Sequence, residues 1–261
     1  MTEAIYFVDA GSEALAQRTA AYIAERTQEA TRARGRARIA ISGGNSPRRA
    51  FELLAEEPFR GRIDWERVEI YWVDERAVPP DSADSNYRMA REALLSKVPL
   101  KQEQIFRVRG ELDAEEAAAK YESDIRGSFR LEGAQMPAFD LIALGMGPDG
   151  HTASLFPYTG ALHESMRIAV ANHVLSQKVA WRITLTWPVI NQGRDVFFLI
   201  EGEDKAEPLH KALLGDHNPE EIPSQLVRPA NGRLTLLLDR AAASLLPAPG
   251  ADGRGRLELP R

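Results

Sequence analysis

Residues 37–54 read "ARIAISGGNSPRRAFELL", and this stretch decides the fold because it runs from a strand through a glycine turn into a helix. The apolar part ends at Ser42, and the two glycines that follow allow a tight turn. Ser46 before Pro47 indicates a helix start, with Ser46 as the N-cap and Pro47 at the first helical position. The N-terminus of such a helix can hold an anion, although a well-capped turn that binds nothing has the same pattern. The candidate binding residues here are Ser42, Gly43, Gly44 and Ser46.

Apolar runs alternate with helical stretches along most of the chain. We predict strands at 5–8, 37–42, 68–73, 105–108, 139–144, 167–170, 182–186, 195–200 and 234–239. We predict helices near 12–33, 47–56, 86–96, 113–126, 204–214 and 240–246. This alternation favours an α/β fold, a doubly wound and mostly parallel sheet with helices on both faces. Ligands of such folds bind at the carboxyl ends of the strands.

The length of 261 residues fits one large α/β domain, which we expect to span residues 1–246. The remaining stretch, "PAPGADGRGRLELPR" at 247–261, is expected to be a flexible tail. Apolar residues make up 44% of the chain and charged residues 27%, which is ordinary for an enzyme-like globular protein.

Charge and residue usage exclude several classes of function. The formal charge of −5 argues against nucleic acid as a partner. The absence of cysteine excludes disulfides and thiolate chemistry, and the five histidines lack metal-ligand spacing, so no metal or other cofactor is expected. The N-terminus lacks an apolar signal segment, and no run approaches the length of a membrane span. We therefore expect a cytoplasmic protein with no membrane partner.

A second strand end carries charge. The stretch "VEIYWVDERAVPPDSADSNY" at 68–87 delivers Asp74, Glu75 and Arg76 to the carboxyl end of a strand. A proline- and aspartate-rich loop then leads to a helix that we expect to be capped near Ser85. Charges at a strand end can also be merely solvated, so this stretch alone leaves both interpretations open.

The stretch "GMGPDGHTASLFP" at 145–157 fits two nucleotide motifs incompletely. A dinucleotide-binding turn should lead into a long helix, but Pro157 follows only seven residues after Gly150. A phosphate-binding loop needs a lysine where this chain has His151. What the pattern does predict is a strand-end turn that sets Asp149 beside His151. A lone histidine is more often structural, but its position in this turn favours proton transfer at neutral pH.

Two further cations lie near the ends of later strands. Arg182 begins the predicted strand "RITLT", and Lys205 of "GEDKA" falls in the first turn of a helix. A cation there opposes the helix dipole at a cost of up to about 1 kcal/mol. An anionic ligand would remove that conflict, although Glu203 and Asp204 could already compensate it.

Together, the motifs "SGGNSP", "VDER", "DSNYRMA", "GMGPDGHTASLFP", "RITLT" with "PVIN", and "GEDKA" resemble those of the 6-phosphogluconolactonases of the pentose phosphate pathway. They occur in the family's order over residues 42–206, with weaker likeness to about 243. The resemblance implies a metal-independent hydrolase of 6-phospho-D-glucono-1,5-lactone. It also implies a sugar-phosphate isomerase-like fold, shared with glucosamine-6-phosphate deaminases.

The resemblance also implies roles for single residues. His151 matches the family's catalytic histidine and Asp149 the adjoining acid, while Arg76, Arg182 and Lys205 match residues that hold the phosphate and polar end of the ligand with the Ser42–Gly44 turn. Secondary candidates are Asp74 and Asn86. We expect His151 to deprotonate a water that attacks C1 and to return the proton to the leaving ring oxygen. Asn45 departs from the family, in which "GGSTP" and "GGRTP" are common.

Two other functions fit parts of the pattern. A related deaminase or aldose–ketose isomerase would move a proton at C2, with Asp74 as a possible base. Deaminase-type sequences typically carry an "NEP"-like segment after the glycine–histidine step, whereas "SLFP" follows here. A non-catalytic sugar-phosphate sensor is a third reading, but no helix-turn-helix segment is left over. Both a monomer and a small homo-oligomer are compatible with the sequence.

Overall fold

The computed structural model describes residues 3–259, in which eight strands form the main sheet in the order β11-β1-β10-β9-β6-β2-β3-β5. Neighbouring strands are parallel except for β11, which runs antiparallel to β1. The strand bounds are Glu3–Asp9 (β1), Ala37–Ile41 (β2), Val68–Trp72 (β3), Ile105–Phe106 (β5), Leu141–Leu144 (β6), Asp195–Ile200 (β9), Arg233–Asp239 (β10) and Arg254–Glu258 (β11). The predicted mostly parallel α/β sheet is confirmed.

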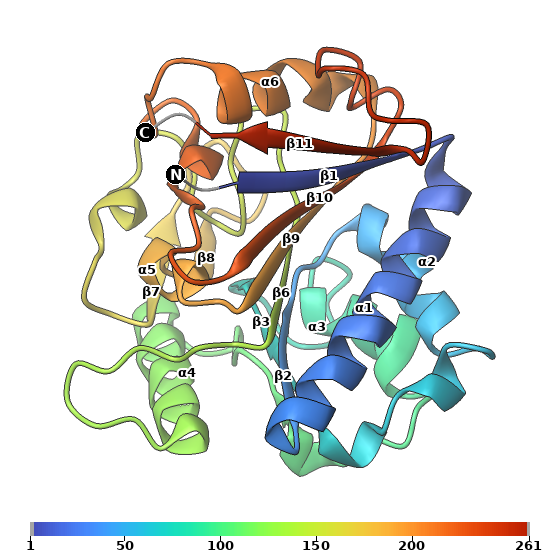
Figure 1. The fold of residues 1–261 in the computed structure, drawn as a ribbon. Coiled ribbons are helices and arrows are strands. Elements are labelled where there is room, and N and C mark those ends of the chain that lie inside the picture. The colour runs from blue at the N-terminus through green and yellow to red at the C-terminus, as the bar shows by residue number, and fades with distance from the viewer. Residues whose placement is uncertain (1–2, 260–261) are drawn as a thin grey trace.

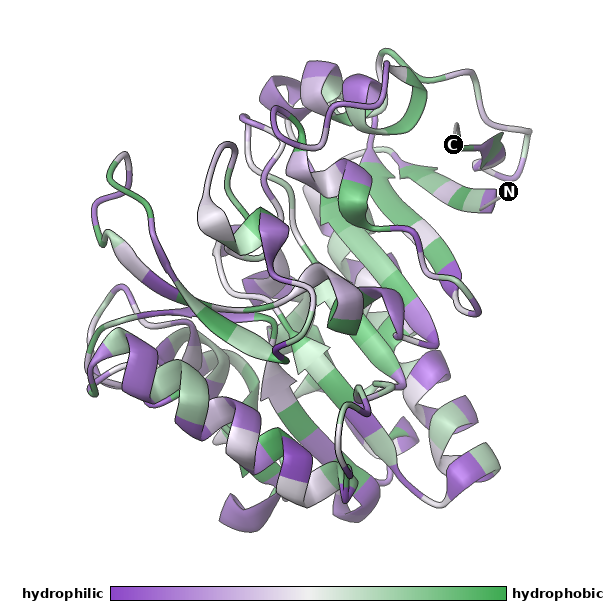
Figure 2. Ribbon diagram, turned by 90° about the vertical axis from the view of Figure 1, so that its left-hand side faces the viewer, coloured by the Kyte–Doolittle hydropathy of each residue, from purple (hydrophilic) through white to green (hydrophobic). Residues whose placement is uncertain are grey.

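Helices cover both faces of this sheet, as Figure 1 shows, with α1 and α2 on one side and α4 on the other. Their bounds are Ser12–Arg34 (α1), Asn45–Leu54 (α2), Asn86–Ala90 (α3), Ala114–Phe129 (α4), Trp187–Asn191 (α5) and Ala206–Leu214 (α6). The predicted helix at 86–96 is α3 followed by a π-helical turn over Arg91–Leu95. The apolar central strands lie between the helices (Figure 2), because strands such as β9 are buried along their whole length.

Two of the predicted strands do not join the main sheet. β7 (Ala169–His173) and β8 (Trp181–Leu185) form an antiparallel hairpin, and β4 (Asp74–Arg76) pairs with β8 to make a second, three-stranded sheet. The short connection between β7 and β8 permits only an antiparallel pair. β4 follows β3 after Val73 alone, so the chain leaves the main sheet at that point. The register of the small sheet places Arg76 opposite Arg182.

The start of α2 differs from the prediction. The helix begins at Asn45, its N-cap is Gly44 with φ 102°, and no side chain caps it. Ser46 as N-cap is therefore wrong, because Gly44 makes the turn one residue before the helix begins. Pro47 falls at the third helical position, where its missing N–H has no helical partner to lose. Ser46 instead sits in the first turn.

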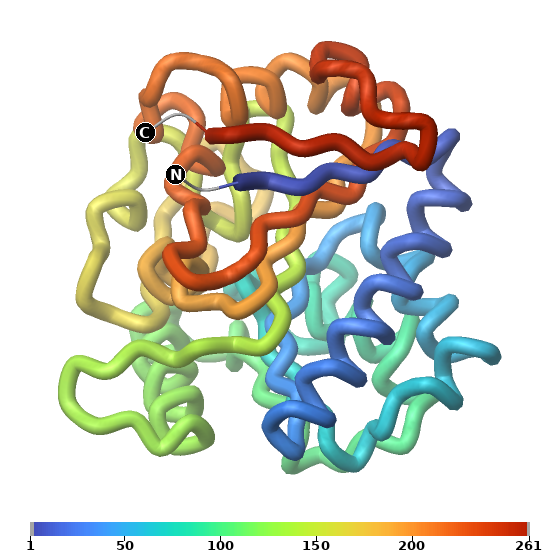
Figure 3. Tube along the Cα trace, viewed as in Figure 1, coloured from blue at the N-terminus to red at the C-terminus, as the bar shows by residue number. Residues whose placement is uncertain are grey.

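The C-terminal part also differs. The predicted helix at 240–246 is a series of turns instead. At their start, the backbone N–H of Ala242 donates to the carboxylate of Asp239 (2.8 Å). The predicted flexible tail is wrong over residues 254–258, because β11 pairs there with β1. In the tail the apolar Leu257 and Leu259 are buried, which anchors it. Figure 3 shows β1 and β11 side by side.

The extent of the domain stays a prediction. Residues 1, 2, 260 and 261 lie outside the described part of the chain. Within residues 3–259, no helix is long and apolar enough to cross a membrane.

Candidate active site

A cavity of about 300 Å³ lies at the carboxyl ends of β2, β6 and β9, with β4 and β8 along one side. This is where the fold rule for parallel sheets places a ligand. The cavity, called the strand-end pocket below, brings together ten of the eleven candidate residues. They are Ser42, Gly43, Gly44, Ser46, Asp74, Arg76, Asn86, His151, Arg182 and Lys205. The eleventh candidate, Asp149, lies behind His151 and lines a neighbouring hollow.

His151 and Asp149 form a hydrogen-bonded pair. Nδ1 of His151 lies 2.5 Å from Oδ1 of Asp149. The two side chains meet because Gly150 adopts φ 76° and the turn is closed by a bond from the N–H of Gly147 to the carbonyl of His151 (2.9 Å). With Nδ1 engaged by the carboxylate, Nε2 is the ring nitrogen left to exchange a proton with a ligand or water.

The ionisation of Asp149 supports this tautomer. Partial burial alone would raise the pKa of the Asp149 carboxyl, but the hydrogen bond and charge of His151 outweigh it and hold that pKa below its usual value. Asp149 is therefore a carboxylate at neutral pH and accepts the proton on Nδ1. Asp149 does not itself line the strand-end pocket and contacts the imidazole from behind.

Two further residues hold the imidazole in place. The ring of Phe156 stacks on the ring of His151, with centroids 4.0 Å apart and planes 22° from parallel. Gly147 leaves room on another side, since a Cβ atom there would stand 2.1 Å from Nδ1 of His151. Phe156 is buried, so its ring is a fixed surface for the histidine.

The second strand end is organised by Glu75, which is almost fully buried. Its carboxylate accepts hydrogen bonds from the backbone N–H groups of Arg76 (2.8 Å), Asn86 (2.7 Å) and Tyr87 (2.8 Å). Burial raises the pKa of Glu75 above its usual value, and these backbone bonds offset part of that rise. Glu75 thus ties β4 to the start of α3, where Ser85 is the N-cap as predicted.

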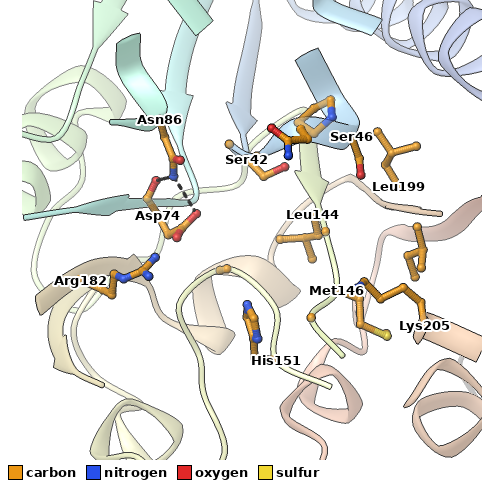
Figure 4. Close-up of a pocket in the computed structure, with 18 of the residues that line it drawn as sticks. Ser42, Ser46, Asp74, Asn86, Leu144, Met146, His151, Arg182, Leu199 and Lys205 are labelled. Atoms are coloured by element: carbon orange, nitrogen blue, oxygen red, sulfur yellow. Dashed lines mark hydrogen bonds between the residues drawn. The ribbon is translucent and has the colours of Figure 1, made fainter. Parts of the chain in front are cut away.

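Asn86 and Asp74 form one wall of the strand-end pocket (Figure 4). The amide Nδ2 of Asn86 donates to the backbone carbonyl of Asp74 (3.0 Å), and Ser154 donates to the Asp74 carboxylate (2.7 Å). Oδ1 of Asn86 is buried without a hydrogen-bond partner among residues 3–259. It lies against Gly43, where a Cβ atom would stand 1.9 Å from it. Gly43 is therefore required for this close approach.

Arg76 and Arg182 place two positive charges side by side. Arg182 donates to the carbonyl of Val179 (2.9 Å) and to the side chain of Gln177 (3.0 Å), while Nη1 of Arg76 donates to the carbonyl of Asp84 (2.6 Å). All of these acceptors are uncharged. Burial lowers the pKa of Arg182, and the neighbouring Arg76 lowers it further. Nε of Arg76 is buried and has no hydrogen-bond partner in the described residues. An anion in the pocket would balance the charges of the Arg76 and Arg182 guanidinium groups and accept their free N–H donors.

Lys205 lies across the strand-end pocket from Arg182 (Figure 4). It ends a 3₁₀ turn over Glu203–Lys205 and is the N-cap residue of α6, rather than lying within the first turn of that helix. Its ammonium group pairs with the carboxylate of Asp204. Asp204 therefore does compensate the positive charge of Lys205 at the helix N-terminus, as the sequence allowed. The Lys205 side chain still lines the strand-end pocket.

Sequence reasoning missed several residues of the site. Phe156 belongs to the quoted "SLFP" segment, and its aromatic side chain close after His151 was the available signal. Gln177 comes from the β7–β8 connection, and no sequence pattern marks it. Asn45, where the sequence departs from the family motif, also lines the pocket. Within residues 3–259, no three His, Asp or Glu side chains gather as they would around a metal ion.

The fold and the site define an α/β protein with a cationic pocket at the carboxyl edge of its sheet. A family model described as "Glucosamine-6-phosphate isomerases/6-phosphogluconolactonase" matches residues 10–236. The chain belongs to this family, which confirms the resemblance drawn from its motifs.

Individual relatives give a finer comparison. The chain is 38% identical over 233 residues to a 6-phosphogluconolactonase of Synechocystis sp., covering 89% of this chain and 94% of the relative. It is 40% identical over 218 residues to the 6-phosphogluconolactonase of Homo sapiens, covering 83% of each. The solved structure of 6-phosphogluconolactonase from Trypanosoma cruzi superposes with a TM-score of 0.82 at 31% identity, covering 92% of this chain and 96% of that one.

A monomeric glucosamine-6-phosphate deaminase has the same fold. Its structure gives a TM-score of 0.76 and covers 94% of this chain and all of that one, at 21% identity. At that identity the match shows a shared fold and nothing about activity. The fold therefore does not by itself distinguish lactone hydrolysis from deamination.

Proposed function

We propose that this protein hydrolyses 6-phospho-D-glucono-1,5-lactone to 6-phospho-D-gluconate in the cytoplasmic, oxidative part of the pentose phosphate pathway. The observation that carries the proposal is the His151–Asp149 pair at the edge of a pocket with cations on two sides. Relatives of 34–40% identity named 6-phosphogluconolactonase support the choice of substrate.

The chemical step uses His151 as base and then as acid. Nε2 removes a proton from a water molecule as the water oxygen attacks C1 of the lactone. The tetrahedral intermediate then collapses, the bond between C1 and the ring oxygen breaks, and the imidazolium returns its proton to that oxygen. Asp149 stabilises the positive charge that His151 carries between these two steps. A lactone carbonyl is electrophilic enough that no covalent intermediate is required.

The cations bind the negative charge of the substrate. The Ser42–Gly44 turn opens onto the N-terminus of α2, whose unpaired N–H groups favour an anion, and Lys205 adds positive charge at the same pocket. We place the phosphate there. Arg76 and Arg182 supply charge on the facing wall, where the uncharged partners of both leave them free to bind substrate.

The test is a direct assay of the lactone. The lactone is formed from glucose-6-phosphate, and its decay is followed with and without purified protein, because spontaneous hydrolysis is the reference. The protein should accelerate the decay, and His151→Ala should lower kcat by about 10²- to 10⁴-fold while the variant still binds 6-phosphogluconate. Absence of acceleration by the wild-type protein would sink the proposal. Release of ammonia from glucosamine-6-phosphate would point to the deaminase instead.

A further inference from the structure

Five arginines surround a second hollow, at the end of the sheet opposite to the strand-end pocket. It has a volume of about 250 Å³ and is called the arginine hollow below. Its arginines are Arg34, Arg36, Arg38, Arg130 and Arg194. Figure 1 shows the end of α1 and the start of β2 together at the lower edge of the molecule, where Arg34 and Arg36 lie.

The backbone fixes these arginines near one another. The N–H of Asp140 donates to the carbonyl of Arg38 (2.9 Å), and the N–H of Arg194 donates to the carbonyl of Phe139 (2.9 Å). The amino ends of β2, β6 and β9 are therefore aligned. Arg130 adds the end of α4, where it caps the helix with φ 55°. Segments far apart in the sequence thus contribute to one hollow.

The positive charge exceeds what the protein neutralises. Within residues 3–259, the ion pairs of these five arginines reach two carboxylates, those of Asp140 and Glu69. The carboxyl ends of the α1 and α4 dipoles offset about one further charge. Two elementary charges or so are left, in a chain whose formal charge is −5. A cationic hollow on an acidic protein is a specific feature rather than the effect of an overall basic surface.

The two carboxylates are themselves already engaged. Asp140 is buried and accepts bonds from Nε of Arg34 (2.5 Å) and from the backbone N–H of Arg38 (2.8 Å). Glu69 accepts bonds from Nε of Arg38 (2.9 Å) and from the hydroxyl of Tyr71 (3.0 Å). Each guanidinium has five N–H donors, so most donors of Arg34, Arg36 and Arg194 have no partner among residues 3–259 and can bind a ligand.

Arg38 gives the hollow one preorganised guanidinium. It lies 4.0 Å above the ring of Phe129 and donates to the carbonyl of Ser128 (2.8 Å). Its side chain is 18% exposed, whereas those of Arg36 and Arg194 are 53% and 52% exposed. The hollow therefore combines one largely buried cation, held by its contacts, with cations that are about half exposed.

We propose that the arginine hollow binds a small polyanion that carries two or more phosphate groups. Guanidinium forks match phosphate oxygens in pairs, and several of them together favour a ligand with several charged groups. The volume of about 250 Å³ exceeds what a single phosphate fills. This site is independent of the proposed lactone hydrolysis, because none of its residues lines the strand-end pocket.

Inorganic diphosphate is the probe, measured by titration calorimetry at physiological ionic strength. The wild-type protein should bind it saturably, and the double variant Arg36→Ala/Arg194→Ala should bind it at least about tenfold more weakly. These two arginines are the exposed ones, and Asp140 and Glu69 keep Arg34 and Arg38 as partners, so the variant should fold. Arg91→Ala is the matched control, an exposed arginine outside the hollow.

The strand-end pocket also attracts anions, so Lys205→Ala, at the place assigned to the substrate phosphate, separates the two sites. Diphosphate binding that survives in Lys205→Ala and weakens in the double variant supports the proposal. Binding that is kept in the double variant overturns it, whether or not Lys205→Ala loses it, as does the absence of saturable binding at millimolar diphosphate. Orthophosphate bound as tightly as diphosphate would overturn the preference for a polyanion. Binding of a DNA duplex without saturable diphosphate binding would overturn it in favour of a nucleic-acid surface.

Discussion

A Cβ atom on Gly147 would lie 2.1 Å from Nδ1 of His151 and 2.7 Å from Oδ1 of Asp149. Even a methyl group at position 147 must therefore push the two side chains away from their bonded geometry. If the pair performs the proton transfer, Gly147→Ala should lower kcat by at least about tenfold, since general acid–base catalysis contributes about 10² or more. The measurement is steady-state kinetics of lactone hydrolysis.

Gly160→Ala is the matched control for this prediction. It lies outside the strand-end pocket, and a Cβ atom there would meet nothing within 4 Å. Its kcat should stay close to that of the wild type. Normal turnover by Gly147→Ala would contradict the role of the histidine–aspartate geometry.

Asp149→Asn tests whether the carboxylate orients the imidazole. An amide can donate as well as accept, so it no longer selects the tautomer with the proton on Nδ1. It also cannot balance the imidazolium charge. We expect kcat to fall by at least about tenfold, with KM nearly unchanged because Asp149 does not line the strand-end pocket. A rise in KM without a loss of kcat would show that Asp149 contacts the substrate instead.

The position of the site was predictable because the carboxyl ends of parallel strands meet at one edge. Ser42, Asp74 and His151 each follow such a strand, so a sheet prediction alone brings them together. Lys205 could be found for the same reason, as it follows β9. The family motif indicates Arg182, but the strand-end argument does not, because Arg182 lies near the start of its strand and reaches the pocket only through the second sheet.

Other features depend on tertiary contacts that have no local pattern. In the sequence, Glu75 is one more charged residue at a strand end. It is buried because the start of α3 packs against β4, where the N–H groups of Asn86 and Tyr87 donate to its carboxylate. The pairing of β11 with β1 joins the two ends of the chain, so composition alone indicates a loose tail. Ser46 before Pro47 fits an N-cap, but Gly44 makes the turn first, and only the backbone angle shows this.

Glu75→Gln tests the buried carboxylate between β4 and α3. The amide has one acceptor oxygen where the carboxylate has two, so backbone N–H groups now bonded to Glu75 lose a partner. We expect the free energy of unfolding to fall by about 1–3 kcal/mol, measured by urea denaturation. Glu66→Gln on the exposed surface is the control and should change it little.

The pH dependence of this loss has a definite sign. The pKa of Glu75 is raised in the folded protein, so the folded state binds this proton more readily than the unfolded chain. The contribution of Glu75 to the free energy of unfolding therefore decreases as pH rises from about 4 through the raised pKa. The difference between wild type and Glu75→Gln should be largest at acid pH and smaller at neutral pH. The opposite trend would mean that the backbone bonds outweigh burial.

Lys205→Ala tests the placement of the phosphate. The phosphate takes no part in bond breaking, so its contacts are equally strong before and during the reaction. Losing one should raise KM, by about tenfold or more for a charge-assisted contact, while kcat changes little. Lys211→Ala is the control, since Lys211 lies on α6 outside the strand-end pocket and pairs with Glu207. A kcat loss at unchanged KM in Lys205→Ala would instead place Lys205 at the lactone end, and the phosphate would then belong with Arg76 and Arg182.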